Sequence, residues 1–555
     1  MAAEAPQRDD AVGRTARLAR SVLHLTAVVA PAVPIGTTVG LQISRGWRPT
    51  SDDAAIAWRT WDVFSAHAPL VGAFNDATLS NGHAVFDPGP LEYYLLAVPE
   101  RIDPVHGILW GAAVLCAVLA GLAVEAAWRA SGVLAAVPVA AGFLVLAATQ
   151  PTSMIDLPWN PNLGVFAFSA TLVLSAVAGS GRLRWWPVAV VAGSLAVQCH
   201  LVFGIAACVC LLAGLLLGAR QQLTAPALTQ LSESRSSPPG AASEAVSSGA
   251  WRGIVRPACL GVVLGLVSLA APFAQQVEDS PGNLTLLLRN LANPGPRLGD
   301  AFGLRGIGRI AGFPPAWARP APPISGADWY QHFRQALVAG GAVAARRPGL
   351  AALASAGVVS GLAMAWTFGS IANPFATVVT YTDVALWPVG MALDACLLWA
   401  AWELAAAGYR YLTATTALPL RLAGWDRTQA GALLAAAVLT PLLVWSVTTL
   451  VPAASTNLAV IGGWQVARAV TPLAEAIEKS RPSEPVLVEP SVQLLPSGLP
   501  TWALTEGLAY ELHVAGIDVR LMPPMQPELG PDAAPAAHQI VYLVEPRGSG
   551  WTLVR

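Results

Sequence analysis

The run PVAVVAGSLAVQCHLVFGIAACVCLLAGLLLG (187–218) decides how this chain crosses a membrane. As a single helix it would be about 48 Å long, too long to cross ~30 Å of hydrocarbon once without a steep tilt. Arginines flank the run on both sides, and short arginine-rich segments stay cytoplasmic, so an even number of crossings lies between them. These arginines are Arg182 and Arg184 before the run and Arg220, Arg252 and Arg256 after it. We therefore predict a hairpin of two short helices with Gln198-Cys199-His200 at its outer tip.

The composition extends this conclusion to most of the chain. Of 555 residues, 54% are hydrophobic and 12% are charged, whereas soluble domains carry about 25% charged residues. The net charge of −1 and the lack of a basic stripe exclude a nucleic-acid-binding surface. All six cysteines lie in apolar runs, so no disulfide framework is predicted.

Apolar runs of about 20 residues predict a mainly α-helical, polytopic membrane bundle over residues 22–452. Arginines in residues 1–21 predict a cytoplasmic N-terminus that leads into an uncleaved signal anchor. With the hairpin and a weak candidate at 329–345, parity gives about 11 spans and an extracytoplasmic C-terminus. The other predicted spans are 22–43, 105–127, 133–149, 162–178, 257–276, 348–369, 383–407 and 428–452.

The polar segments divide into loops, a linker and a terminal domain. Residues 44–104 and 277–330 are predicted as large outer loops, and the Ser/Ala/Pro-rich segment 219–256 as a disordered cytoplasmic linker. Strand patterns at 485–490, 517–523 and 539–546 alternate with helical spacing at 465–480 and 501–515. Residues 453–555 are therefore predicted to form a small extracytoplasmic α/β domain.

The first outer loop begins with an unusual group of acids in SDDAAIAWRTWDVFSAHAPLVG (51–72). An aspartate here is a good cap for an amphipathic helix at the membrane surface. A cap needs one carboxylate, however, and Asp52, Asp53 and Asp62 supply three. Capping and catalysis both remain open on the residues alone.

Motifs in the same order over residues 44 to about 290 resemble the GT-C class of membrane glycosyltransferases, and most closely an actinobacterial group of such proteins. The group's histidine before the P-G-P turn is Asp87 here, which puts a ligand role for that position in doubt. The matching segments are Asp52-Asp53-Ala54-Ala55-Ile56, Arg59-Thr60-Trp61-Asp62-Val63, Ala66-His67-Ala68-Pro69-Leu70-Val71-Gly72, Pro88-Gly89-Pro90-Leu91-Glu92-Tyr93-Tyr94-Leu95-Leu96-Ala97, Pro158-Trp159-Asn160-Pro161, Val197-Gln198-Cys199-His200 and Gly282-Asn283-Leu284-Thr285.

The resemblance implies transfer of a sugar from a polyprenyl-phosphate carrier to a cell-envelope glycan or lipid acceptor, with inversion, at the outer face of the plasma membrane. Asp52 matches the motif acid and would be the general base, with Asp53 as the alternative. Substrate contacts are expected from loop cations and polar groups. The expected contact residues are Arg59, Asp62, His67, Glu92, Tyr93, His200, Asn283 and Arg289.

No cofactor is required by the sequence. A divalent cation is compatible with Asp52, Asp53, Asp62 and His67, but no ligand spacing demands one, and no metal site is assigned. Two other functions remain alternatives: a transporter or flippase of polyprenyl-linked lipids, and a non-catalytic membrane scaffold. The two halves of the chain show no internal repeat, which disfavours the transporter.

Overall fold

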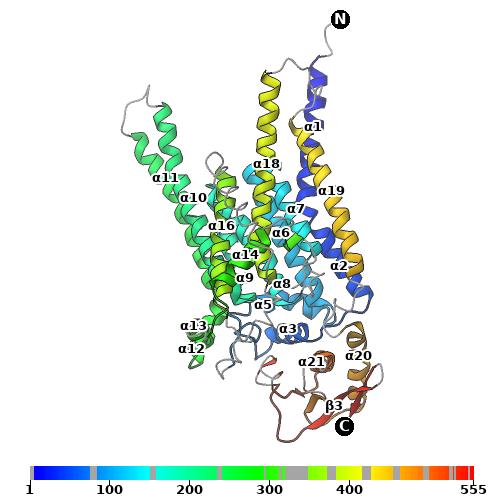
Figure 1. Cartoon of the computed structure of the whole chain (residues 1–555). Coiled ribbons are helices and arrows are strands. Elements are labelled where there is room, and N and C mark those ends of the chain that lie inside the picture. Colours follow the sequence, from blue (N-terminus) through cyan, green and yellow to red (C-terminus); the bar gives the residue numbers. More distant parts are fainter. Residues whose placement is uncertain are drawn as a thin grey trace.

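The computed structural model of the chain describes residues 5–75, 84–149, 158–233, 241–292, 296–311, 316–318, 348–371, 383–415, 427–453, 463–491, 499–523, 525, 529–530, 533–547 and 550–555. These residues form a bundle of long helices, with a small mixed sheet and its helices at one end (Figure 1). The predicted fold class, a mainly helical multi-span membrane protein with a C-terminal α/β domain, is confirmed.

The N-terminal half of the bundle follows the predicted spans. Helices α1 (Ala5–Val29) and α2 (Ala32–Ser44) form a pair bent by 43° at Pro31, where the proline interrupts the helical hydrogen bonding. Next come α6 (Gly107–Ser131), α7 (Val133–Thr149) and α8 (Asn160–Gly179). Helix α8 is buried along its whole length and is the centre of the bundle.

The predicted hairpin is present. Helix α9 (Trp186–Cys199) ends at His200, whose backbone is extended, and α10 (Gly204–Glu233) begins after the short turn η4 (Leu201–Phe203). The His200 Nδ1 atom accepts a hydrogen bond from the Val202 N–H at 3.1 Å, which satisfies a backbone donor that the break leaves without a helical partner. The helix break at His200 therefore lies at the position that the arginine pattern predicted for the hairpin tip.

The predicted disordered linker 219–256 is largely helical in the structure. Helix α10 continues to Glu233 and α11 (Ala241–Ser268) already begins at Ala241, while residues 234–240 lie outside the described residues. Both segments extend helices that are already nucleated, so alanine- and glutamine-rich polar sequence continues them at little cost. A short helix, α12 (Ala270–Glu278), follows α11.

The second outer loop, 277–330, contains helices that were not predicted. They are α13 (Asn283–Ala292), α14 (Asp300–Ala311) and the 3-10 turn η5 (Ala316–Ala318). Helix α14 packs against α16 (Pro348–Gly369), and Gly303 comes so close to the Ala365 carbonyl that a Cβ would clash. Its glycines and arginines lowered the hydropathy and hid this helix from a pattern search.

The bundle is completed by η7 (Asp383–Leu386), α18 (Trp387–Thr415) and α19 (Arg427–Ala453). Six of the described helices are long and apolar enough to cross a membrane, or seven if α1 and α2 count as one span. The predicted total of about 11 also counted α7, α9 and the apolar part of α19, which are shorter helices. It counted 329–345 as well, which lies outside the described residues.

The described residues of the C-terminal domain form four strands and two helices. In chain order these are α20 (Trp464–Lys479), β1 (Val486–Pro490), α21 (Leu499–Val514), β2 (Val519–Arg520), β3 (Ile540–Arg547) and β4 (Gly550–Val554). The strand order is β2-β1-β3-β4, with β1 parallel to β2 and β3, and β4 antiparallel to β3. The three predicted strands and both helices are confirmed, and β4 is an addition.

The ends of the bundle differ in what they carry (Figure 1). The described parts of the C-terminal domain, α12, α13 and α3 (Asp52–Trp61) lie at the lower end, whereas the start of α1, the end of α10 and the start of α11 lie at the upper end. Helices α3, α12 and α13 and the C-terminal domain, all predicted to be extracytoplasmic, therefore share one end, whereas α14 lies within the bundle. Which side of the membrane that end faces stays a prediction from the arginine pattern.

Candidate functional site

The acidic segment forms helix α3, whose start contacts the C-terminal domain. Ser51 is its N-cap, with an unusual positive φ of 53°, and makes no side-chain capping bond. The Ser51 N–H donates to the Ala503 carbonyl of α21 at 3.2 Å, so the C-terminal domain holds the backbone where the helix begins. The aspartates follow in the first turn, where negative charge suits the helix dipole.

The two adjacent aspartates have opposite environments. Asp52 is exposed, and its Oδ2 accepts a hydrogen bond from Trp159 Nε1 at 2.7 Å. Asp53 is 2% exposed and lies in the protein interior. Successive side chains on a helix point about 100° apart, so only one of the pair can face outward. The accessible carboxylate is Asp52.

Trp159 belongs to the P-W-N-P motif and is the residue directly before α8. Residues 150–157, which precede this motif, lie outside the described residues. The indole N–H fixes the Oδ2 atom of Asp52, and the Ser51 hydroxyl lies 3.5 Å from Oδ1. A carboxylate held in this way is oriented for proton transfer.

Arg59 lies about two turns after Asp52 on α3 and is half-buried. Its Nη1 lies 3.4 Å from the Leu529 carbonyl in the C-terminal domain. Its charge also acts on two tyrosines of α5 (Leu91–Ile102): burial raises the pKa of Tyr93 and of Tyr94, and the guanidinium opposes that rise. A cation therefore sits between α3, α5 and the C-terminal domain.

Glu92 and Tyr93 lie on the inner face of α5, 3% exposed each. Burial raises the pKa of Glu92 to about 8, with a smaller contribution from the nearby negative charge of Asp87. A hydrogen bond with Cys199 partly opposes the rise. These two predicted contact residues therefore lie beneath the surface on which Asp52 is exposed.

Asp62, the third acid of the segment, is 8% exposed and starts the turn η1 (Asp62–Phe64). Its Oδ1 atom lies within hydrogen-bond distance, 3.0 Å, of Nε2 of His513 in α21. Arg101 covers the same turn, with its guanidinium 3.7 Å from the centre of the Trp61 ring and Nη2 donating to the Trp61 carbonyl at 2.9 Å. The structure thus places Asp62 in the contact with the C-terminal domain.

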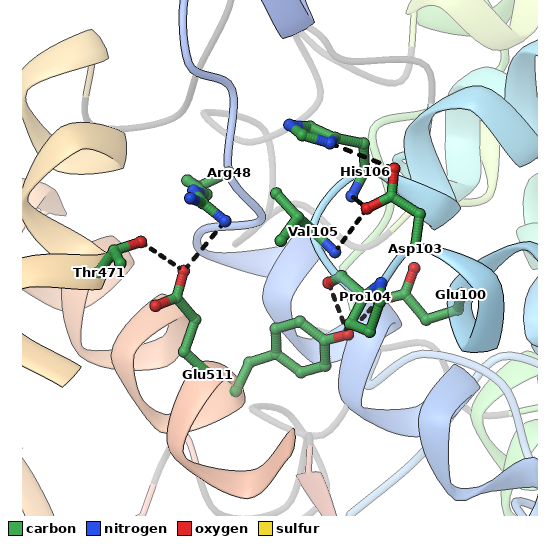
Figure 2. Close-up of polar contacts among 9 residues, drawn as sticks. Arg48, Glu100, Asp103, Pro104, Val105, His106, Thr471 and Glu511 are labelled. Carbon is green, nitrogen blue, oxygen red and sulfur yellow. Dashed lines mark hydrogen bonds and ion pairs between the residues drawn. The ribbon is translucent and has the colours of Figure 1, made fainter. Parts of the chain in front are cut away.

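Glu100 makes a second contact with the C-terminal domain (Figure 2), which the sequence did not predict. Glu100 of α5 is completely buried, accepts the Ile108 N–H at 2.7 Å and is hydrogen-bonded by the Tyr510 hydroxyl. That hydroxyl is also 3.0 Å from the Pro104 carbonyl. Burial raises the pKa of Glu100 to about 8.

The neighbouring residue of α21, Glu511, continues this interface (Figure 2). Its Oε1 accepts a hydrogen bond from Thr471 at 2.9 Å and pairs with Arg48 at 3.5 Å. Burial raises the pKa of Glu511 while the Arg48 charge opposes the rise. Residues from α20, α21 and the segment before α3 therefore meet at one polar junction.

Asp87 joins several segments at the same end of the bundle. It is 2% exposed and accepts hydrogen bonds from Asn75 Nδ2 at 3.1 Å, Asn160 Nδ2 at 3.1 Å and the Leu201 N–H at 3.2 Å. The Asn160 Nδ2 also donates to the Cys199 carbonyl at 2.6 Å. The aspartate that replaces the expected histidine thus ties the P-G-P turn to α8 and to the hairpin tip.

Two further motif residues hold the same turn in place. Gln198 Nε2 donates to the Ser268 carbonyl at 2.8 Å, and its Oε1 accepts the Leu91 N–H at 3.3 Å. A Cβ on Gly89 would clash with this Gln198 side chain, which explains the glycine between two prolines. Asn283, predicted to contact substrate, bonds both the N–H and the carbonyl of Phe86, at 2.9 and 3.0 Å.

The remaining predicted residues are more dispersed. His67 is exposed after η1, and Arg289 is exposed in the last turn of α13. His200 lies in the hairpin break, close to the Leu201 N–H that binds Asp87. Within the described part of the chain, no three His, Cys, Asp or Glu side chains are grouped in a way that could hold a metal ion.

Comparisons with known proteins give distant structural likenesses. No family model and no curated protein sequence matches the chain. The chain is similar to the apo crystal structure of ArnT from Cupriavidus metallidurans, with a TM-score of 0.46 and 15% identity, over 89% of this chain and 86% of that one. It is also similar to the Archaeoglobus fulgidus oligosaccharyltransferase tethered to an acceptor peptide, with a TM-score of 0.40 and 13% identity, over 88% of this chain and 63% of that one. At these scores the likenesses assign no activity.

Proposed function

We propose that this chain is a membrane glycosyltransferase of the GT-C type that uses Asp52 as its general base. The observation that carries the proposal is the difference in environment between two adjacent aspartates. Asp52 is exposed and hydrogen-bonded by the Trp159 indole, whereas Asp53 is buried. The motif resemblance selects the same aspartate. A cap alone would not require a separate residue to orient the carboxylate.

In the proposed reaction, Asp52 accepts the proton of an acceptor hydroxyl while the acceptor oxygen forms a bond to the anomeric carbon of the sugar. The bond from that carbon to the phosphate oxygen of the carrier breaks, and the polyprenyl phosphate leaves with the electron pair. Attack opposite the leaving group inverts the anomeric centre. No external oxidant, reductant or metal is needed for this balance.

The leaving phosphate gains negative charge in the transition state and needs a cation or hydrogen-bond donors. Arg59 is the proposed cation because it shares α3 with Asp52 and also contacts the C-terminal domain. His67, His200 and Arg289 are proposed to bind the donor phosphate, the sugar or the acceptor. The arginine pattern supports an extracytoplasmic site, which suits a cell-envelope glycan or lipid as the acceptor.

The test is turnover of purified protein with a panel of polyprenyl-phosphate sugars, comparing the wild type with Asp52→Asn and Asp53→Asn. Loss of a general base should reduce kcat by about 10²- to 10⁴-fold in Asp52→Asn. Asp53→Asn should keep turnover within about tenfold of the wild type, since its carboxylate does not reach the substrate surface. A thermal unfolding scan of both variants separates a catalytic defect from a folding defect.

Equal turnover in wild type and Asp52→Asn would remove Asp52 as the base. Loss of turnover only in a well-folded Asp53→Asn would transfer the role to Asp53. Transport of an intact carrier-linked sugar across a vesicle, with no glycosidic bond formed, would favour the transporter alternative.

A further inference from the structure

An arginine-lined cleft lies at the end of the bundle opposite the C-terminal domain. Its walls come from the turn η3 (Leu183–Trp185) after α8, the later part of α10 and the start of the apolar part of α11. The cleft has a volume of about 540 Å³. Its lining residues are Gly181, Arg182, Leu183, Arg184, Gln222, Arg252, Gly253, Arg256 and Pro257.

All the charged residues that line this cleft are positive. Four of its residues are arginines, all exposed, and its lining contains no carboxylate. In the part of the chain that the structure describes, none of the four forms an ion pair with an acid. Four arginines around one cleft repel one another, and an anion among them relieves this repulsion.

The walls are also held in a defined geometry. Gln222 Nε2 donates to the Gly181 carbonyl at 2.7 Å, which ties α10 to the turn after α8, where Gly181 has a φ of 97°. Arg182 Nη2 donates to the Ala130 carbonyl at 2.9 Å, which fixes that side chain and leaves its other N–H groups for a ligand. These two hydrogen bonds hold the wall around Gly181 and reduce the entropy that Arg182 would lose on binding a ligand.

The location suits a lipid rather than a soluble anion. Arg252 and Arg256 lie in the first turns of the candidate span Trp251–Ser268, only 11% of which is buried in the protein. Trp251 is 59% exposed, as expected of a tryptophan at headgroup depth. Beyond the arginines, α11 presents exposed apolar side chains such as Leu260 and Val263, 53% and 54% exposed.

We infer that this cleft binds the phosphate headgroup of an anionic phospholipid, whose acyl chains lie along the exposed face of α11. Arginine suits phosphate because its planar fork donates two parallel hydrogen bonds. Basic pockets between membrane helices are a known way to bind such headgroups. This site is separate from Asp52 and does not depend on the proposed transferase activity.

The test measures lipid binding to detergent-purified full-length protein by native mass spectrometry. The probes are phosphatidylglycerol, phosphatidylcholine with the same acyl chains, and inorganic phosphate. We expect phosphatidylglycerol to bind, with an affinity at least ~10-fold lower in the double variant Arg252→Gln/Arg256→Gln. Phosphatidylcholine and inorganic phosphate should bind at least ~10-fold more weakly than phosphatidylglycerol to the wild type.

The matched control is Arg20→Gln/Arg220→Gln, which removes two exposed arginines from α1 and α10 that do not line the cleft. It should bind phosphatidylglycerol within about twofold of the wild type. Arg184→Gln, on a different wall, should also weaken binding, which keeps the test valid if the first double variant unfolds. Equal losses of phosphatidylglycerol affinity in both double variants would show that the lipid responds to the total positive charge and not to this cleft. Inorganic phosphate binding as tightly as the lipid would show that the cleft binds soluble anions. Either result overturns the inference.

Discussion

The imidazole Nε2 of His513 lies 3.0 Å from the carboxylate Oδ1 of Asp62, although 451 residues separate the two in the chain. The same imidazole stacks on Trp58, with ring centres 3.8 Å apart and planes within 10°. Both partners of His513 belong to the acidic segment that contains Asp52. The C-terminal domain therefore contacts the candidate site directly.

Replacing His513 by alanine should destabilise the folded chain by about 1–3 kcal/mol, because Asp62 would lose its partner in a buried position. Asp62→Asn should cost less on the His513→Ala background than on the wild type. Thermal unfolding of the two single variants and the double variant measures this coupling. His538→Ala, at an exposed position, is the control and should change little. Additive effects of the two substitutions would contradict a direct pair.

Glu100 should make stability depend on pH. Its pKa is raised from 4.5 to about 8 by burial, so between these values the folded chain keeps a proton that the unfolded chain has released. Stability therefore falls as pH rises from about 4.5 through 8. Glu100→Gln should flatten this slope, since the amide can accept from Ile108 and donate to Tyr510.

The measurement is the unfolding midpoint of wild type and Glu100→Gln from pH 5 to pH 9. Glu92, with a pKa also raised to about 8, contributes in the same direction, so part of the slope should remain. Exposed Glu478 provides the matched control, Glu478→Gln, which should leave the slope unchanged. Identical slopes for wild type and Glu100→Gln would show that Glu100 is already ionised at neutral pH.

Trp159→Phe should reduce turnover by about tenfold while keeping the aromatic ring. In the wild type the indole N–H stabilises the charged, base-competent form of Asp52. Without this hydrogen bond, the acidic limb of the pH–rate profile should move to higher pH. The profile is the decisive measurement, because a purely structural role would lower the rate without moving the limb. Trp399→Phe makes the same change at an indole N–H with no hydrogen-bond partner among the described residues, and should leave the profile unchanged.

Ser51→Gly should stabilise the chain by about 1 kcal/mol. Ser51 has φ 53° and ψ −138°, a conformation that strains any residue with a Cβ. Ser51→Ala is the matched comparison, because it removes the same hydroxyl and keeps the Cβ. A higher unfolding midpoint for glycine than for alanine is expected, and the reverse order would show that the Ala503 contact imposes no strain.

The sequence predicted the helical bundle well because burial in lipid demands long apolar runs. The break at His200 followed from arginine parity, and 348–369 matches α16 residue for residue. The helices α13 and α14 were missed because they are only 10 and 12 residues long and are interrupted by polar residues, so no span-length apolar run marks them. The helical ends of α10 and α11 were missed because composition does not reveal that a neighbouring helix already supplies the nucleus.

The candidate site was predicted less completely. Pattern matching identified Asp52, Trp159 and Asp87 as motif positions, but only coordinates separate an exposed Asp52 from a buried Asp53. Tyr510 and His513 gave no signal, since their partners Glu100 and Asp62 lie more than 400 residues away in the chain. Asn160 and Gln198 were in quoted motifs, yet their role as connectors depends on backbone partners that no sequence pattern displays.

The hydrogen bond from Ser51 to Ala503 also has a consequence in time. Helix α3 leaves the ribosome long before α21 is made, and at ~5–20 residues per second the delay is about 20–90 s. During this interval the start of α3 lacks the bond that fixes Ser51, and Asp62 lacks His513. A nascent or truncated chain would thus carry the acidic segment without its final geometry until the last domain has docked.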